Sequence, residues 1–133
     1  MKTSVLDASA LLAMFFAEPG MEKMRELFQK SAETDHPALI SALNWAEVLY
    51  LMERRRGVDG MDTARRFRRT MPIDVVALDS DLAESAALFK NRHDLGLADA
   101  VAAALAKSKN AELVTADNEF KRLEKEIRIN WLK

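Results

Sequence analysis

Short runs of strand-forming residues alternate with longer helical segments along this sequence, and the alternation limits the folds that the chain can adopt. Apolar and β-branched runs predict strands at residues 3–6, 38–41, 73–78, 112–115 and 127–131. Helical spacing and cap residues predict helices at residues 8–16, 21–32, 43–55, 62–70, 79–91, 97–107 and 118–123. Strands separated by helices need crossover connections. The pattern therefore predicts an α/β fold, a three-layer α/β/α sandwich with a mostly parallel central sheet, and leaves the strand order open.

Size and composition predict a single domain over residues 1–133. The chain has 133 residues, which suits one hydrophobic core, and 49% of them are hydrophobic, enough to offset the entropy lost on ordering. No repeat, low-complexity tract or Pro/Gly-rich linker divides the sequence. The one weak break, at residues 57–60, predicts a turn between two helices.

Composition also excludes several classes of protein. The net charge is −1, so the chain is not a globally basic nucleic-acid binder, and any such contact needs a local patch or metal ions. The absence of cysteine excludes disulfides, thiolate metal sites and thiol nucleophiles, and two histidines argue against a His-rich zinc site. The apolar run at residues 8–17 is too short to span a membrane and predicts a helix rather than a signal peptide, so a cytoplasmic location is expected.

Four acidic residues fall near predicted strand ends or helix starts. Asp7 directly follows the first strand, and Asp117 follows the strand at 112–115. Glu47 lies early in the helix after the strand at 38–41, and Asp99 lies in the first turn of the helix after Gly96. Open parallel sheets bind ligands beyond the carboxyl ends of their strands. We therefore expect these four carboxylates to gather at one edge of the sheet.

Each of the four acids also has an ordinary structural interpretation. Asp7 and Asp117 can cap the helices that follow them, and Asn44 to Glu47 has the spacing of a capping box. Asp99 fits such an interpretation least well, because it is the only charged residue in the apolar stretch 95–106. A carboxylate buried there is costly unless it is paired or binds a metal.

Carboxylates crowded together predict a divalent metal ion. Without a cation they repel, so at least one should have a raised pKa and titrate jointly with its neighbours. Sites built only from oxygen ligands suit Mg²⁺ or Mn²⁺. Such ions activate water and stabilise charge on a phosphoryl oxygen, so hydrolysis of phosphodiesters is the reaction that this set of residues favours.

Four short motifs contain these acids: VLDASAL at 5–11, NWAEV at 44–48, LADA at 97–100 and LVTADNEF at 113–120. In this order and at these separations they resemble the PIN-domain family, specifically the VapC-type toxins of bacterial and archaeal toxin–antitoxin pairs. The resemblance implies a three-layer fold, Mg²⁺- or Mn²⁺-dependent endoribonuclease activity, homodimerisation and inhibition by a cognate antitoxin protein.

The resemblance also implies roles for particular residues. Asp7, Glu47, Asp99 and Asp117 match the acidic quartet of the family, with Asp7 and Asp99 expected as direct metal ligands. Asp117 and Glu47 are expected to bind directly or through water, or to orient the attacking water. Two hydroxyl residues, Ser9 and Thr115, match positions that orient these carboxylates. Two further acids, Asp94 and Glu119, fall outside the pattern and are expected to be a turn residue and a helix-start acid.

Arginines cluster on the two helices around the predicted turn at residues 57–60. The five considered for RNA binding are Arg54, Arg55, Arg56, Arg65 and Arg66. They could form a phosphate-binding rim, or a solvated face with local salt bridges to Glu53, Asp59 and Asp62, and the solvated face is slightly favoured.

Two further questions stay open: what the apolar face at residues 21–32 packs against, and whether the chain is an enzyme or only binds its partners. The Met/Leu/Phe stripe at residues 21–32 could be a groove for an antitoxin helix or part of the chain's own core. A catalytically silent PIN-like module that binds RNA or protein is the competing function, and retention of all four acids argues against it.

Overall fold

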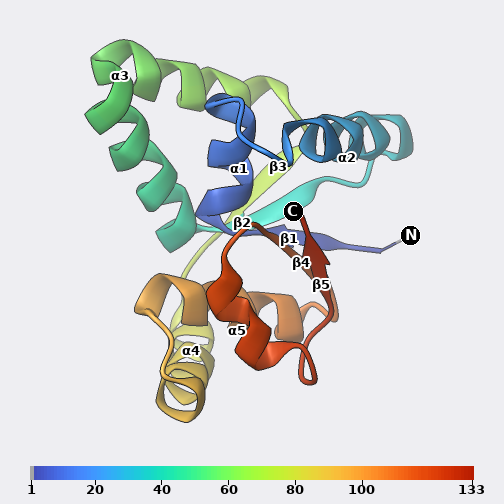
Figure 1. Cartoon of the computed structure of the whole chain (residues 1–133), viewed down its shortest axis with the longest axis vertical. Coiled ribbons are helices and arrows are strands. Elements are labelled where there is room, and N and C mark those ends of the chain that lie inside the picture. Colours follow the sequence, from blue (N-terminus) through green and yellow to red (C-terminus); the bar gives the residue numbers. More distant parts are fainter. Residues whose placement is uncertain (1) are drawn as a thin grey trace.

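The computed structural model describes residues 2–133, which form one five-stranded sheet flanked by helices (Figure 1). The strands are β1 Ser4–Leu6, β2 Ala38–Ser41, β3 Ile73–Val76, β4 Glu112–Thr115 and β5 Ile129–Trp131. The helices are α1 Ala8–Phe15, α2 Met21–Thr34, α3 Ala42–Thr70, α4 Ser80–His93, α5 Leu97–Ser108 and the 3₁₀ helix η1 Asn118–Leu123. All four strand pairings are parallel, in the order β3-β2-β1-β4-β5. The predicted α/β class is confirmed.

Side chains that alternate along the central strands separate two cores. Val5 and its β4 partner Leu113 belong to the core under α4, α5 and η1. Their neighbours Leu6 and Val114 point the other way, into the core under α1, α2 and α3. Figure 1 shows these two groups of helices on opposite faces of the sheet. Both faces are covered, which explains why the central strands are apolar throughout rather than alternating with polar residues.

The strand order positions the acidic residues. β1 lies between β2 and β4, so the chain leaves three adjacent strands at the same edge, into α3, α1 and η1. Backbone pairing continues past the strand ends, because the Asp7 N–H donates to the Val114 carbonyl at 3.4 Å. This edge therefore gathers segments that lie far apart in the sequence.

Helix α3 consists of two helical segments joined at Gly57. The predicted break is present there, since Gly57 has φ 67° and ψ −157°, a conformation that residues with a side chain rarely adopt. The expected turn over residues 57–60 is shorter than predicted, because Gly60 is already helical. Gly60 is buried where the segments meet, and a Cβ on it would lie 2.6 Å from the Met52 carbonyl oxygen. Glycine at 60 thus permits the close approach.

Replacing Gly60 should destabilise the fold. Gly60→Ala places a methyl group against backbone that cannot move freely, and we expect a loss of about 1–3 kcal/mol in the free energy of unfolding. Gly96→Ala is the control, because nothing lies within 4 Å of the added Cβ there. Urea denaturation of both variants measures the difference, and equal stabilities would contradict the assigned close contact.

The start of α3 corrects one expectation. Asn44 and Glu47 do not form a capping box, because the helix begins at Ala42 and its N-cap is Ser41. The Asn44 N–H donates to Ser41 Oγ at 3.0 Å. Ser41 ends β2, so the strand passes into the helix without a loop and Glu47 lies in the second turn.

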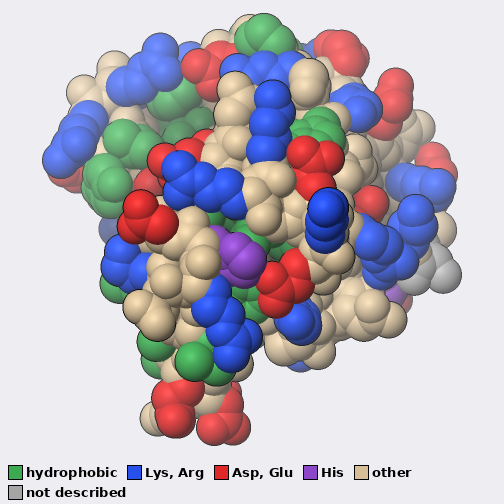
Figure 2. All heavy atoms as spheres, turned by 60° about the horizontal axis from the view of Figure 1, so that its bottom comes forward, with side chains coloured by type: hydrophobic (Ala, Val, Ile, Leu, Met, Phe, Trp, Pro, Cys, Tyr) green, Lys and Arg blue, Asp and Glu red, His purple; other side chains and the backbone are tan. Residues whose placement is uncertain are grey.

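Charged side chains of both signs are interspersed over the face shown in Figure 2. This agrees with the near-neutral net charge of −1. Within residues 2–133, no helix combines the length and the apolar character that crossing a bilayer requires.

Candidate metal centre

Asp7 is a buried carboxylate held in one orientation at the end of β1. Its side chain is 2% exposed and caps α1, with Oδ1 accepting the Ala10 N–H at 3.0 Å. The Ser9 hydroxyl donates to the same oxygen at 2.7 Å, and the Thr115 hydroxyl donates to Oδ2 at 2.6 Å. The capping role expected as the ordinary alternative is therefore present, together with two hydroxyl contacts that a helix cap does not need.

Ser9 and Thr115 also fix the segment that carries Asp117. Ser9 Oγ accepts the Ala116 N–H at 3.0 Å, and Thr115 Oγ1 accepts the Asp117 N–H at 2.9 Å. Each hydroxyl thus contacts Asp7 on one side and the backbone before Asp117 on the other. The two side chains that the resemblance singled out join the ends of β1 and β4 into one hydrogen-bonded unit.

Asp99 completes a group of three carboxylates. It lies in the first turn of α5, whose N-cap is Gly96. One carboxylate oxygen from each of Asp7, Asp99 and Asp117 lies within 4.8 Å of the other two. Asp117 caps η1 by accepting the Glu119 N–H at 2.9 Å on Oδ1. Three of the four predicted acids therefore meet at the carboxyl edge of the sheet.

Glu47 borders this group rather than joining it. Its carboxylate is not among the three within 4.8 Å, and it projects from the second turn of α3. Burial raises the pKa of Glu47, and the charge of Asp117 adds to the rise. The structure therefore places Glu47 within electrostatic range of the group of three.

The two remaining acids behave differently from each other. Asp94 is exposed and ends α4 in a left-handed conformation, φ 52°, so it is the turn residue that was expected. Glu119 follows Asp117 in η1, and its carboxyl adds to the rise in the pKa of Asp99, after burial and the charge of Asp117. Glu119 is therefore a further acid at the rim of the site, in addition to being the helix-start residue that was expected.

Asn44 is a site-bordering residue that sequence reasoning assigned only to a helix cap. Its side chain is fully buried and bonds to the Ser41 hydroxyl. Its Nδ2 also donates to the Ala98 carbonyl at 3.2 Å, directly before Asp99. Asn44 thus joins the helix of Glu47 to the helix of Asp99. A polar residue one turn before Glu47 is the only sequence signal, and a cap explains such a residue equally well.

The electrostatics of the group penalise its ionised form. Burial raises the pKa of Asp7 to about 6, and the charge of Asp117 adds to this, against the hydrogen bonds from Thr115, Ser9 and Ala10. Burial likewise raises the pKa of Asp99 to about 8, with further contributions from Asp117, Glu119 and Asp7. No basic group appears among these causes. The raised pKa that crowded carboxylates predict is present, with burial as its largest cause.

These residues fit a divalent cation. Asp7, Asp99 and Asp117 supply only oxygen ligands, the preferred set for Mg²⁺ or Mn²⁺. At metal–oxygen distances of about 2.1 Å, the ligands of one octahedral ion lie about 3.0 Å apart when adjacent and about 4.2 Å apart when opposite, so three oxygens within 4.8 Å of one another would draw closer together around the ion. A cation would also offset the repulsion that raises the pKa of Asp99.

The raised pKa values predict how stability and metal affinity depend on pH. Between pH 4 and pH 8 the unfolded chain loses the Asp99 proton while the folded chain keeps it, so the metal-free protein loses stability as pH rises, up to about pH 8. Asp7 contributes in the same direction up to about pH 6. Because a cation competes with these protons, its affinity should rise over the same range. Thermal unfolding and Mn²⁺ titration at pH 6, 7 and 8 test both trends, and a metal affinity independent of pH would contradict the assigned ligands.

The arginines considered for RNA binding are exposed on both segments of α3, but they do not form the predicted local ion pairs as a group. Arg65 pairs with Asp62 at 3.6 Å, and Arg55 approaches Glu18 at 4.0 Å. The guanidinium groups of Arg55 and Arg56 instead stack on the Phe16 ring, at 3.8 and 4.8 Å from its centroid. Stacking holds these cations on the surface without neutralising them.

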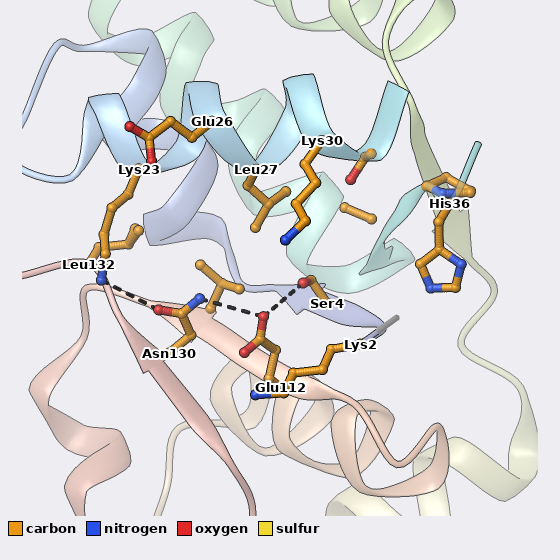
Figure 3. Close-up of a pocket in the computed structure, with 14 residues that line it drawn as sticks. Lys2, Ser4, Lys23, Glu26, Leu27, Lys30, His36, Glu112, Asn130 and Leu132 are labelled. Atoms are coloured by element: carbon orange, nitrogen blue, oxygen red, sulfur yellow. Dashed lines mark hydrogen bonds between the residues drawn. The ribbon is translucent and has the colours of Figure 1, made fainter. Parts of the chain in front are cut away.

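A cavity of 500 Å³ lies away from the acidic group (Figure 3). Ser4, Ala38 and Glu112, at the amino ends of β1, β2 and β4, line it together with Lys23 and Lys30 of α2 and other residues. In Figure 3, Lys30 reaches from α2 toward the strands. This is the opposite edge of the sheet from Asp7 and Asp117. The cavity is therefore separate from the acidic group.

Comparisons with known proteins agree with this fold and site. The profile of the PIN domain family matches residues 4–126. Ribonuclease VapC30 from Mycobacterium tuberculosis is 31% identical over 123 residues, covering 87% of this chain and 91% of that protein. DNA-bound VapBC from Salmonella typhimurium has a chain with a TM-score of 0.80 at 21% identity, covering 100% of both chains. Mycobacterium tuberculosis VapC20, a sarcin-ricin loop cleaving toxin, gives 0.74 at 22% identity over 90% of this chain and 93% of that one. The chain belongs to the PIN domain family, among its VapC-type members.

Proposed function

We propose that this chain is a Mg²⁺- or Mn²⁺-dependent endoribonuclease, acting as one domain over residues 1–133 in the cytoplasm. The convergence of Asp7, Asp99 and Asp117 at the carboxyl edge of the sheet is the observation that carries the proposal. Relatives named ribonuclease support RNA as the substrate. The raised pKa of Asp99, which a divalent ion would lower, supports the metal.

The proposed roles follow from the contacts of each residue. Asp7 and Asp99 hold the metal directly, and Thr115 and Ser9 keep the Asp7 carboxylate oriented toward it. Asp117 binds directly or through water. Glu47, at the border of the group, accepts a proton from the water that attacks phosphorus, and the leaving ribose oxygen departs with a proton from solvent. The bound metal supplies a Lewis acid for the phosphoryl oxygen and lowers the pKa of water.

RNA would reach this edge past the two segments of α3. The proposed rim consists of Arg54, Arg55, Arg56, Arg65 and Arg66, which are exposed and contact phosphates. Of these, Arg65 pairs with Asp62 and Arg55 with Glu18, so Arg54, Arg56 and Arg66 are expected to carry most of the phosphate contacts.

We further propose that the chain is the toxin of a type II toxin–antitoxin pair, inhibited by a cognate antitoxin protein and active as a homodimer. Structural neighbours include DNA-bound VapBC from Salmonella typhimurium and VapBC-1 from nontypeable Haemophilus influenzae, which supports an antitoxin partner. The apolar stripe of α2 is an incomplete candidate for its docking surface, because Met24 and Phe28 are buried in the chain's own core.

Incubation of the purified chain with structured RNA tests the activity. We expect cleavage with Mn²⁺ or Mg²⁺, and its loss when EDTA is added. RNA that is bound but stays intact in Mn²⁺ would instead favour the catalytically silent binding module. Chromatography with the product of a neighbouring small open reading frame tests the antitoxin, which should form a complex and suppress the cleavage.

A further inference from the structure

Tyr50 is the only exposed aromatic side chain among residues 2–133, and it lies on α3 close to Glu47, which borders the acidic group. It is 44% exposed, whereas Trp45, on the same helix, is 6% exposed and packs in the core. Tyr50 comes three residues after Glu47, and residues three apart are neighbours on a helix surface. At a rise of about 1.5 Å per residue, the Cα of Tyr50 lies about 4.5 Å further along α3 than the Cα of Glu47.

Arg54 continues this strip of α3 outward from the sheet. It lies seven residues, close to two turns, after Glu47, and its guanidinium carbon is 4.9 Å from the centroid of the Tyr50 ring. Arg54 makes no ion pair in the part of the chain that the structure describes. Its positive charge therefore remains available next to an exposed ring.

The strip lies on the side of α3 that is turned away from α1 and α2. Val48 and Met52, on the other side of this segment, are buried in the core that includes α1 and α2. Leu43, one turn before Glu47, packs against the core under α5, on the side of Asp99. Figure 1 shows this segment leaving the carboxyl edge of the sheet and extending away from the strands. Glu47, Tyr50 and Arg54 thus form a strip of α3 that begins at the border of the acidic group and leads outward to exposed side chains.

We infer that Tyr50 and Arg54 bind one unpaired nucleotide of the RNA, beside the phosphate that the acidic group cleaves; this inference rests on the proposed function. The base stacks on the Tyr50 ring, and the Arg54 guanidinium contacts the adjoining phosphate. An exposed ring with a neighbouring cation is the arrangement that single-stranded RNA recognition uses. A base inside a duplex is already stacked on its neighbours, so the pair selects loops and unpaired ends.

Binding without cleavage tests this inference independently of the activity. Variants of Tyr50 and Arg54 are made in an Asp99→Asn chain, and their affinity for a labelled, unstructured RNA oligonucleotide is measured by fluorescence anisotropy in EDTA. Tyr50→Ala should weaken binding about 5- to 100-fold, the usual range for loss of one base stack. Tyr50→Phe keeps the ring and should keep the affinity. A perfect RNA duplex of the same length should bind equally well to the Tyr50→Ala and parent chains.

Arg54→Ala should weaken binding to the oligonucleotide. It should also reduce the magnitude of the slope of log affinity against log salt concentration by about 1, which corresponds to the loss of one phosphate contact. Lys109→Ala removes one exposed charge beyond the end of α5 and should leave both quantities unchanged. In the cleaving chain, Tyr50→Ala should raise KM for RNA more than it lowers kcat.

Three results would overturn the inference: Tyr50→Ala binding the oligonucleotide as tightly as its parent, Tyr50→Phe losing as much affinity as Tyr50→Ala, or equal losses on duplex and single strand. The proposed function fails on a different observation, the absence of metal-dependent cleavage by the unmodified chain. The two failures are therefore distinguishable.

Discussion

Asp99→Asn should abolish RNA cleavage while making the metal-free protein more stable. Removing a metal ligand should cost more than the 10- to 100-fold typical of residues that only orient ligands, so we expect a loss of at least about 100-fold in kcat/KM. Burial and neighbouring acids raise the pKa of Asp99 to about 8, so at neutral pH the folded chain holds a proton that the unfolded chain has lost, and this lowers the free energy of unfolding. The neutral amide removes that penalty and should raise the Tm in EDTA.

Asp94→Asn is the matched control, because Asp94 is an exposed carboxylate just before α5 and lies outside the acidic group. Asparagine tolerates the left-handed conformation there, so activity and Tm should stay close to those of the unmodified chain. Gel assays and thermal unfolding measure both quantities. Cleavage that survives in Asp99→Asn would contradict the role given to this carboxylate.

Thr115→Val should weaken both metal binding and the fold. The variant keeps the shape of the side chain but leaves Asp7 Oδ2 without its hydroxyl donor and the Asp117 N–H without its acceptor. Each buried group left unpaired costs about 1–3 kcal/mol. Loss of the group that orients Asp7 should lower metal affinity about 10- to 100-fold.

Thr115→Ser tests whether the hydroxyl, rather than the methyl group of threonine, is responsible for these effects. Serine can donate to Asp7 and accept from Asp117 in the same way, so metal affinity should return to within a few fold. Calorimetric titration with Mn²⁺ and urea denaturation measure the two effects. If serine and valine at position 115 lowered the affinity equally, the hydroxyl bridge could not be the cause.

Most of the fold could be predicted from sequence because the deciding signals are local. The strand at 112–115 and the short helix at 118–123 lie where the pattern placed them. The order β3-β2-β1-β4-β5 could not be predicted, since pairing between distant strands leaves no signal in either strand alone. The shortened turn after Gly57 has a similar cause, because only packing against Met52 reveals that Gly60 is helical.

Part of the candidate site could also be predicted, because some of its signals are local in the sequence. Asp99 stood out because one charge in an apolar helix needs a partner. Whether Glu47 or Glu119 lies near Asp99 depends on the positions of α3 and η1 after the sheet forms. Sequence reasoning therefore placed Glu47 within the group of metal-binding acids and Glu119 outside it. Asn44 was assigned to a cap because its buried contact is with Ala98, which is 54 residues away. Long-range contacts of this kind need coordinates.

Metal binding itself tests the central claim most directly. Mn²⁺ binding, followed by electron paramagnetic resonance at pH 8, is compared in the unmodified chain, in Asp7→Asn, Asp99→Asn and Asp117→Asn, and in Asp94→Asn. The structure predicts a saturable site in the unmodified chain and in Asp94→Asn, and a large loss of affinity in each of the other three variants. Equal Mn²⁺ affinity in all five proteins would show that the carboxylates gathered at the sheet edge do not hold the ion.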